Sequence, residues 1–290
     1  MKLLVTGARG MLGRELTLLL ARDHEVTGID LAEADITDRK MVERVVAAVQ
    51  PEVIVHCAAR TDVDGCESDP VGAYRVNGEG TANIALAARR GNTRLLFIST
   101  DFVFTGSHSE PYVEDEAVGP LNCYGRTKLA GEIATRTLAP DHLIVRTSWL
   151  YGAHGRNFVR TILTRAAAGG ELKVVNDQLG SPTYVPDMAD AISRLVATRA
   201  RGVVHVCNSG AVTWHGFASE IVRQSGISLP VLPISSAELA RPAVRPAYSV
   251  LATDRYRSLT GASLRSWQEA LAAYLQQEKD LQPAFPGGIP

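Results

Sequence analysis

The strongest constraint on the fold comes from three glycines that directly follow a short apolar run. Residues 3–6 form this run, and Gly7, Gly10 and Gly13 come next, in the order Gly-Ala-Arg-Gly-Met-Leu-Gly. The apolar residues that come after the glycines are spaced as on one face of a helix. In a strand–turn–helix unit, such glycines make the turn, let backbone N–H groups approach a pyrophosphate, and allow the helix to pack closely on the strand. We therefore predict a dinucleotide site, with a tight turn that binds no ligand as the alternative.

An acidic residue follows this loop at the spacing expected of a dinucleotide site. Asp30 comes directly after the run 25–29, where a carboxylate accepts hydrogen bonds from the adenosine ribose and repels a 2′-phosphate. Asp30 therefore favours NADH. Arg9, within the glycine loop, has the charge to pair with a 2′-phosphate, although a solvated loop cation explains it equally well. Both NADPH and NADH stay open as cofactors.

Two further segments are candidates for cofactor contacts. Asp35 and Ile36 precede a helical pattern, where a side chain can hydrogen-bond adenine; helix capping by Asp35 or Asp38 is the alternative. After the run 53–57, small residues would let the middle of the cofactor lie against the backbone, and simple close packing would explain them as well. The candidates in this second segment are Ala58, Ala59, Arg60 and Thr61.

The alternation of short aliphatic runs with helical patterns predicts an α/β fold, a Rossmann-type doubly wound parallel sheet. Residues 1–150 are predicted to form an NAD(P)-binding Rossmann domain. Residues 151–290 would form a smaller, interleaved substrate-binding lobe, some of whose segments return to the sheet, and its tail 283–290 is expected to fray. The predicted strands are 3–6, 25–29, 53–57, 95–99, 143–150, 172–175 and 203–207, and helices are predicted at 158–168 and 267–277.

A second constellation combines the end of a predicted strand with a later helical pattern. Thr100 follows the strand, and Tyr124 and Lys128 are four positions apart, so that they share a helix face. A neighbouring ammonium favours the phenolate form of a tyrosine, and Thr100 would hold a carbonyl oxygen beside it. These residues suit carbonyl reduction: a nicotinamide delivers hydride, Tyr124 donates the proton, and Lys128 holds the ribose. An exposed surface pair is the alternative.

Composition argues against several classes of function. Lys plus Arg number 30 and Asp plus Glu 31, so the net charge of −1 offers no footprint for nucleic acid or an anionic membrane. The N-terminal apolar run is too short for a signal peptide and no stretch would span a bilayer, so we expect a cytoplasmic protein without nucleic-acid or membrane partners. The cysteines and histidines lack metal-ligand spacing, so no metal is predicted, and His56 is interpreted as a core histidine.

At these residues the sequence resembles the extended short-chain dehydrogenase/reductase superfamily and, within it, the dTDP-4-dehydrorhamnose reductase family. The resemblance runs over nearly the whole chain. The segments that carry it are 7–13, 58–64, 76–77, 99–106, 120–132, 146–151, 157–158, 177–183 and 245–249. It implies NAD(P)H-dependent reduction of the 4-keto group of dTDP-4-dehydro-β-L-rhamnose, with this small-molecule nucleotide sugar as the substrate.

The resemblance also implies roles for single residues. Tyr124 would be the proton donor, with Lys128 and Thr100 completing a triad. Substrate contacts would come from Thr100, Asp101 and Trp149, whose indole face suits a deoxysugar, although it would equally cap the core. Arg245 is a candidate for the substrate diphosphate or else a surface arginine. The cofactor contacts implied by matching positions are Gly10, Met11, Leu12, Asp30, Asp35, Ile36, Ala59, Arg60 and Thr61.

Two alternatives to this function stay open on the sequence. A related 4-ketoreductase acting on another nucleotide-linked deoxysugar would carry the same triad, because the triad determines the reaction type and not the sugar. A non-catalytic regulatory subunit, like the β-subunit of methionine adenosyltransferase, shares the resemblance, although the intact pair of Tyr124 and Lys128 argues against it. The oligomeric state stays open as well, with a homodimer as one option.

Overall fold

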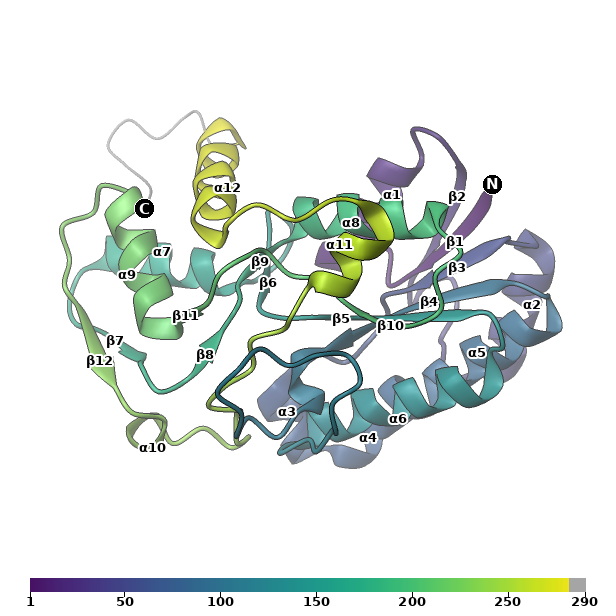
Figure 1. Ribbon diagram of the computed structural model, residues 1–290, viewed down its shortest axis with the longest axis horizontal. Helices are drawn as coiled ribbons and strands as arrows, with labels where there is room; N and C mark the ends of the chain where they lie inside the picture. Colours follow the sequence, from purple (N-terminus) through teal and green to yellow (C-terminus); the bar gives the residue numbers. More distant parts are fainter. Residues whose placement is uncertain (282–290) are drawn as a thin grey trace.

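The computed structural model describes residues 1–281 and is built around a six-stranded parallel sheet (Figure 1). In spatial order its strands are β2 (Glu25–Ile29), β1 (Lys2–Thr6), β3 (Val53–His56), β4 (Arg94–Thr100), β5 (His142–Thr147) and β10 (Gly202–His205). The strand order reverses between β1 and β3, which creates a switch point where ligands of such sheets bind. The predicted doubly wound α/β sheet is confirmed.

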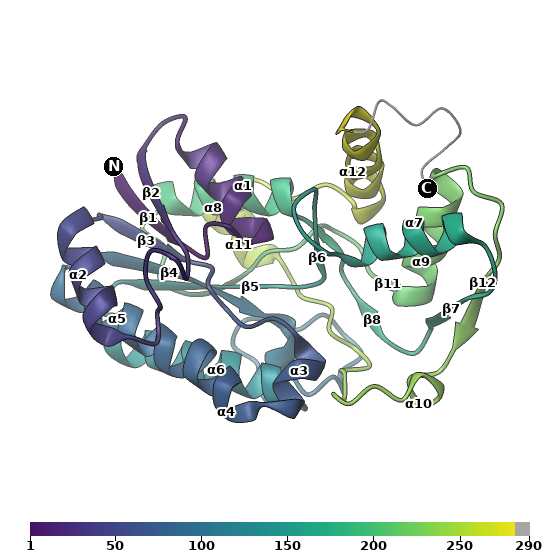
Figure 2. The same cartoon turned by 180° about the vertical axis from the view of Figure 1, so that it is seen from behind.

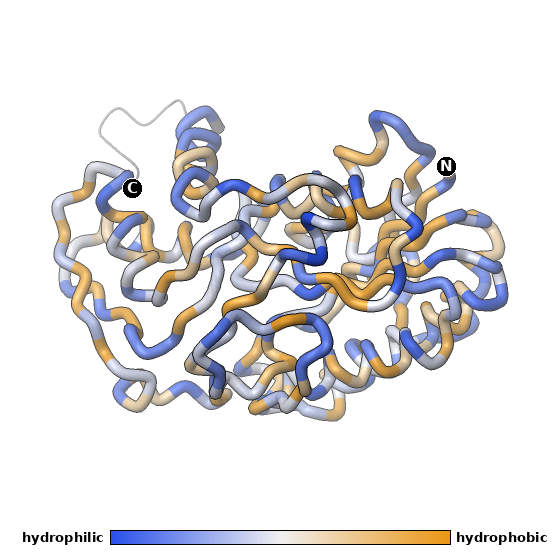
Figure 3. The backbone as a smooth tube through the Cα atoms, viewed as in Figure 1, coloured by the Kyte–Doolittle hydropathy of each residue, from blue (hydrophilic) through white to orange (hydrophobic). Residues whose placement is uncertain are grey.

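Helices cover both faces of this sheet, as parallel strands require (Figures 1 and 2). One face carries α1 (Met11–Leu20), α8 (Val185–Ala197) and α11 (Asp254–Thr260), and the other carries α2 (Arg39–Val49), α5 (Thr81–Arg90) and α6 (Cys123–Leu138). Leu12, Leu16 and Leu20 recur every four residues on the buried side of α1. Figure 3 shows the apolar colour running along the strands of the sheet.

A second core lies beside the sheet, where Tyr151, Tyr184, Phe217 and Tyr274 pack together. Its helices are α7 (Phe158–Ala168), α9 (Trp214–Gln224) and α12 (Trp267–Leu281). Its short strands pair as β6 (Leu150–Tyr151) with β9 (Thr183–Tyr184), β7 (Leu172–Val175) with β12 (Val231–Ile234), and β8 (Leu179–Gly180) with β11 (Val212–Thr213). The remaining short helices are α3 (Val63–Ser68), α4 (Pro70–Tyr74) and α10 (Ser236–Leu239), with a π-helical turn at Arg75–Gly80 and a 3₁₀ turn at Asp101–Val103.

The predicted strand 143–150 was wrong at its end. β5 stops at Thr147, and Trp149 adopts a left-handed backbone conformation with φ of 48°. Leu150 and Tyr151 then pair with β9 and not with the large sheet. The chain therefore leaves the sheet three residues before the predicted end of the strand.

The helix predicted at 158–168 is confirmed, and the one predicted at 267–277 extends to Leu281. From the C-terminal half, α8, β10 and α11 pack against the large sheet; the domain boundary at residue 150 stays a prediction. The tail 283–290 lies outside the described residues. Within residues 1–281, no helix has the length and apolar character needed to cross a membrane.

Candidate active site

A cleft of about 530 Å³ opens where the carboxyl ends of β1, β4 and β5 face the second core. Residues far apart in the sequence meet there because parallel strands all end at one edge of the sheet. Most of the predicted site residues line this cleft. They are Gly7, Gly10, Met11, Leu12, Gly13, Ala59, Thr61, Thr100, Asp101, Tyr124, Lys128, Trp149 and Arg245.

The glycine loop lies at one end of the cleft, and its geometry explains each glycine. Gly7 has φ of 68°, and a β-carbon there would lie 2.7 Å from the backbone nitrogen of Ala58. A β-carbon at Gly13 would lie 2.1 Å from the carbonyl oxygen of Gly7. Gly10 begins α1 without a side-chain cap, and the first turn carries no acidic residue. The N–H groups of α1 thus remain available to an anion, which fits a dinucleotide phosphate.

Asp30 and Arg9 lie together beside the loop but do not line the cleft itself. The Asp30 carboxylate accepts hydrogen bonds from the backbone N–H of Arg9, at 2.9 Å, and of Leu31, at 2.8 Å. The Arg9 guanidinium forms an exposed ion pair with Glu33. Asp30 therefore ties the glycine loop to the end of β2, and Arg9 would have to leave Glu33 to meet a 2′-phosphate.

Four other predicted cofactor residues also lie outside the cleft. Asp35 accepts a hydrogen bond from the backbone N–H of Thr37, and Ile36 is 7% exposed in the core between the sheet and α2. Ala58 packs against the same core. Arg60 turns away, because its guanidinium pairs with Asp69 and donates to the carbonyl of Gly65. Cofactor contacts by these four residues stay a prediction.

His56 is confirmed as a core histidine. It is fully buried, its Nδ1 lies 2.6 Å from the hydroxyl of Thr6, and its Nε2 lies 3.1 Å from that of Thr81. Burial lowers the pKa of His56 to about 3. A neutral ring held between two hydroxyls supports the glycine loop through Thr6 and has no catalytic role.

Tyr124 and Lys128 lie in the first two turns of the long helix α6. Asn122 caps this helix by accepting a hydrogen bond from the N–H of Gly125. Lys128 is 3% exposed, and its Nζ donates to the carbonyl oxygen of Ile98 at 2.7 Å and lies 4.2 Å from the ring centre of Phe97. Burial lowers the pKa of Lys128 to about 8. The ammonium is thus anchored to β4 directly below the cleft.

The pKa of Tyr124 is raised above its ordinary value by burial, against a smaller opposite effect of Thr100. The prediction that the Lys128 ammonium favours the phenolate was wrong for this structure, because Lys128 is bound by a β4 carbonyl and burial dominates. A raised pKa keeps the phenol protonated at neutral pH. Tyr124 therefore carries its phenolic proton before a ligand arrives, as an ordinary tyrosine does.

Two buried polar atoms in the cleft lack hydrogen-bonding partners among residues 1–281. They are Oδ2 of Asp101 and the hydroxyl of Thr147. The hydroxyl of Thr100 donates to the other Asp101 oxygen at 3.0 Å. Because an unpaired buried polar atom costs about 1–3 kcal/mol, such atoms are expected where a polar ligand completes the bonding. Thr147 was not among the predicted site residues, although it lies in the segment 146–151 that carries the resemblance.

Asp101 makes the stability of the fold depend on pH. Burial raises its pKa from 3.8 to about 6. Between these values the folded state binds more protons than the unfolded chain, so the free energy of unfolding falls as the pH rises, and the penalty is fully present above the folded pKa. We expect Asp101→Asn, which cannot ionise, to raise the Tm by several degrees at about pH 8 and much less at about pH 4.

The control for this prediction is Asp23→Asn, a change at an exposed aspartate in the turn between α1 and β2. Thermal unfolding followed by circular dichroism gives both Tm values. A gain for Asp101→Asn that is the same at the two pH values would contradict the role of the buried charge.

Trp149 contributes an aromatic wall to the cleft, together with a residue that the sequence did not indicate. Its ring stacks on that of Trp214, at the start of α9, with ring centres 3.5 Å apart and an angle of 7° between the planes. A β-carbon at Gly180 would lie 2.6 Å from the Trp149 ring. Trp214 and Gly180 thus hold the indole in place, and one of its faces is covered by Trp214 and not open to a sugar.

Two arginines line the cleft from the C-terminal half of the chain. Arg245, which was predicted, pairs with Asp64, and Arg156, which was not predicted, is an exposed residue before α7. Neither lies near the catalytic pair in sequence. Only the folding of the second lobe over the sheet edge brings positive charge to this end of the cleft.

The site as a whole defines a class of protein. A glycine loop at the switch point of a parallel sheet, a Tyr–Lys pair one helical turn apart, and a hydroxyl at a strand end are the parts of a short-chain dehydrogenase/reductase. A family model described as "RmlD substrate binding domain" matches residues 1–279. The chain belongs to this family.

Three comparisons place the chain among its relatives. It is 47% identical to the dTDP-4-dehydrorhamnose reductase of Streptomyces griseus, over 92% of this chain and 91% of that protein. It is 42% identical to the dTDP-4-keto-6-deoxy-D-glucose reductase of Streptomyces niveus, over 92% of this chain and 94% of that protein. A crystal structure of dTDP-4-dehydrorhamnose reductase from Bacillus anthracis in complex with NADP superposes with a TM-score of 0.93 at 38% identity, covering 95% of this chain and 99% of that one.

Proposed function

We propose that the protein reduces the 4-keto group of dTDP-4-dehydro-β-L-rhamnose to give dTDP-β-L-rhamnose, with NADPH or NADH as the hydride donor. The observation that carries the proposal is the cleft in which Thr100, Tyr124 and Lys128 lie beside the glycine loop. The names of the relatives support the substrate class, and the NADP complex from Bacillus anthracis supports the cofactor.

Each part of the cleft has a task in this reaction. The bound cofactor supplies hydride to the sugar carbon. Tyr124, which is protonated at neutral pH, donates its phenolic proton to the oxygen that becomes an alcohol. The Thr100 hydroxyl at the end of β4 would orient that oxygen, and the Lys128 ammonium, which donates to the carbonyl of Ile98, would bind the ribose of the cofactor.

The N-terminus of α1 is proposed to bind the cofactor diphosphate through its free N–H groups, with Gly7 and Gly13 leaving room for it. The Thr147 hydroxyl and Oδ2 of Asp101 offer hydrogen-bonding capacity to the sugar or the nicotinamide, because neither has a partner within the described chain. The aromatic wall of Trp149 and Trp214 offers apolar surface to the deoxysugar or the thymine.

A second candidate is the reduction of a different dTDP-linked 4-keto-6-deoxyhexose. The relative from Streptomyces niveus favours it, because a protein of nearly equal similarity is named for dTDP-4-keto-6-deoxy-D-glucose. The triad would serve both reactions equally, so the residues that line the cleft around the sugar have to determine the substrate specificity.

The test is a substrate panel with both cofactors. Purified protein is mixed with NADPH or NADH and with each freshly generated dTDP-4-ketosugar, and the loss of reduced cofactor is followed by absorbance. We expect oxidation that depends on dTDP-4-dehydrorhamnose, with dTDP-rhamnose as the product by mass spectrometry. No oxidation with any sugar, beside an active relative as control, would refute the proposal and favour a regulatory subunit.

Two further expectations accompany the proposal. We place the reaction in the cytoplasm, where a reduced nicotinamide cofactor is supplied. A homodimer is the assembly to look for, and analytical ultracentrifugation of the full chain distinguishes it from a monomer.

A further inference from the structure

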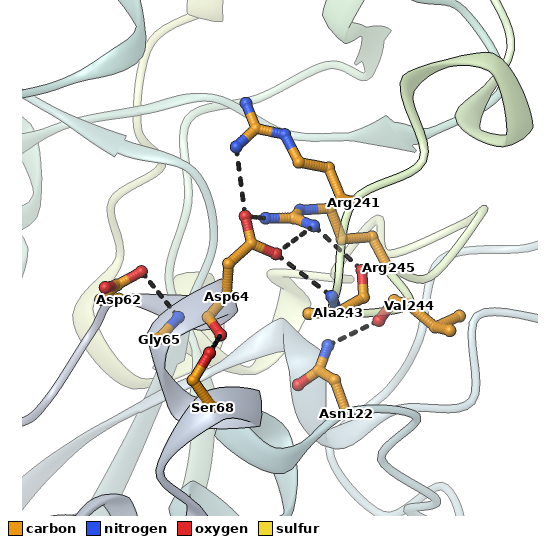
Figure 4. A network of polar contacts seen from close by, with 9 residues as sticks. All are labelled: Asp62, Asp64, Gly65, Ser68, Asn122, Arg241, Ala243, Val244 and Arg245. Carbon is orange, nitrogen blue, oxygen red and sulfur yellow. Dashed lines mark hydrogen bonds and ion pairs between the residues drawn. The ribbon is translucent and has the colours of Figure 1, made fainter.

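One segment of the second lobe crosses back to the large sheet beside the cleft. It consists of residues 241–245, which follow α10, and we call it the strap (Figure 4). The strap is joined to the N-terminal ends of two helices of the large domain, α3 and α6, through Asp64 and Asn122. Neither helix is near the strap in sequence.

Asp64, the second residue of α3, holds the strap with both carboxylate oxygens. Oδ1 accepts from Nη1 of Arg245 at 3.1 Å and from the N–H of Ala243 at 3.2 Å. Oδ2 accepts from Nη2 of Arg245 at 3.1 Å and from Arg241 at 3.2 Å. Burial raises the pKa of Asp64, but the hydrogen bonds of Arg245 and Ala243 outweigh it and hold the pKa below its usual value. Asp64 therefore carries its charge at neutral pH.

Asn122 joins the same strap to the helix that carries the catalytic tyrosine. Its side-chain oxygen caps α6, and its Nδ2 donates to the carbonyl of Val244 at 2.8 Å. Asn122 is 1% exposed, and Tyr124 lies two residues further along. The position of the strap is thus coupled to the start of α6, and Arg245 lines the same cleft as Tyr124.

The hydrogen bonds of Arg245 leave one edge of its guanidinium available. An arginine has five N–H donors in a planar fork. Two on Nη1 point to Asp64 and to the carbonyl of Ala243, and one on Nη2 points to Asp64. Among residues 1–281, the Nε–H and the second Nη2–H have no partner. They form the side edge of the fork, which matches two oxygens of a phosphate.

The charges of this network do not balance. Arg241 and Arg245 share the single carboxylate of Asp64, so the three side chains together carry one positive charge, and Arg245 among them lines the cleft. An anionic group bound to the free edge of Arg245 would neutralise it. A nucleotide sugar carries a diphosphate, which is the anion that the proposed reaction brings to this cleft.

We propose that Asp64 is a positioning residue for the substrate diphosphate, which orients Arg245 so that its free edge faces the cleft. This inference rests on the proposed function for the identity of the ligand. Asp64 does not touch the substrate; it acts by fixing the position of the strap and the plane of the Arg245 guanidinium. The contact between Asp64 and Arg245 thus has two effects: it joins the second lobe to α3, and it orients the group that binds the diphosphate.

The test compares Asp64→Asn with Asp62→Asn. Asp62 lies two residues away and caps α3 by accepting from the N–H of Gly65 at 3.0 Å, so it shares the helix without joining the strap network. We expect Asp64→Asn to raise the KM for the nucleotide sugar about 10-fold, the scale of a lost charge-assisted contact, with kcat changed less than about 2-fold. Asp62→Asn should lower the Tm and leave the KM unchanged.

Binding of dTDP, measured by calorimetry without turnover, separates this inference from the proposed function. Asp64→Asn and Arg245→Ala should each weaken dTDP about 10-fold and leave the Kd of NADPH unchanged, and the double variant should be no weaker than Arg245→Ala alone. Additive losses, or a Kd for dTDP that Asp64→Asn leaves unchanged in a protein with native Tm, would overturn the inference. Weak dTDP binding with no turnover of any sugar by the parent protein would overturn the proposed function as well.

Discussion

Tyr124→Phe is expected to lower kcat by about 10²-fold or more, because it removes the one proton that the cleft holds ready for the ketone oxygen. The Tyr124 side chain lines the cleft together with Thr100, and burial raises the pKa of its phenol above the ordinary value, so the phenol is protonated at neutral pH. The ring itself packs edge-on against Phe102, with centres 5.8 Å apart, and phenylalanine preserves this contact. The loss should therefore be chemical and not structural.

The measurement is steady-state oxidation of NADPH, with the Kd of NADPH from fluorescence titration as the second readout. We expect the Kd to change little, since the glycine loop and Lys128 stay in place. Tyr74→Phe is the matched control: Tyr74 is on α4, 48% exposed and outside the cleft. If Tyr124→Phe kept the parent kcat, a different group would have to donate the proton, and the role given to Tyr124 would fall.

Glu132→Leu is expected to destabilise the fold by about 3–5 kcal/mol, because it leaves a buried cation without its partner. Glu132 is fully buried on α6 and accepts two hydrogen bonds from Arg146 on β5, both at 2.8 Å, and one from Ser99 on β4 at 2.7 Å. Arg146 is itself 1% exposed. At roughly 2–4 °C per kcal/mol, the Tm should fall by about 10 °C or more.

Two further variants distinguish the buried charge from a general packing defect. Replacing both partners, as in Glu132→Leu with Arg146→Met, should recover much of the Tm, since no charge is then left uncompensated. Arg136→Ala removes the other ion pair of Glu132, whose arginine is 42% exposed, and should cost under about 1 kcal/mol. A double variant less stable than Glu132→Leu alone would show that the pair stabilises the fold beyond the cost of an orphaned charge.

Glu132 also helps to fix the position of α6, the helix that carries Tyr124 and Lys128. It lies one turn beyond Lys128 on α6 and binds residues at the ends of β4 and β5, while Lys128 binds the carbonyl of Ile98. The helix is therefore attached to the two strands whose ends line the cleft. The sequence pattern identifies Tyr124 and Lys128, but this attachment decides where they point.

Local spacing predicted the parts of the site that depend on neighbours in the chain. Glycines 7, 10 and 13 imply a turn and a helix N-terminus within one short segment, and Tyr124 and Lys128 share a face because a helix repeats every 3.6 residues. The strands of the large sheet were predictable for the same reason, since each is a short aliphatic or β-branched run between turns, whereas β8, β9, β11 and β12 were not predicted. The strand predicted at 143–150 shows the limit of such predictions. The apolar run continues into β6, and only the pairing of β6 with β9 shows that the strand of the large sheet has already ended.

The residues that the sequence did not reveal act through partners far along the chain. Trp214 stacks on Trp149 across 65 positions, and Asp64 meets Arg245 across 181. Arg156 joins the cleft from a loop outside the segments that carry the resemblance, and Thr147 joins it from a strand end inside one of them, but no role was predicted for either. The pKa of Tyr124 belongs here too, because burial, which arises only in the folded chain, reversed the expected effect of Lys128.

The amino-acid sequence by itself determined the type of fold and the family, and it predicted the loop for a dinucleotide and the pair of Tyr124 and Lys128, because each depends on the local order of residues along the chain. Only the tertiary structure decided which candidates share one cleft, with Asp35, Ile36, Ala58 and Arg60 outside it. It also decided how Asp64 pairs with Arg241 and with Arg245, which lines the cleft. The physical reason is that burial and electrostatic pairing depend on distances through space. Residues far apart in the sequence come within those distances only when the second lobe packs against the edge of the sheet.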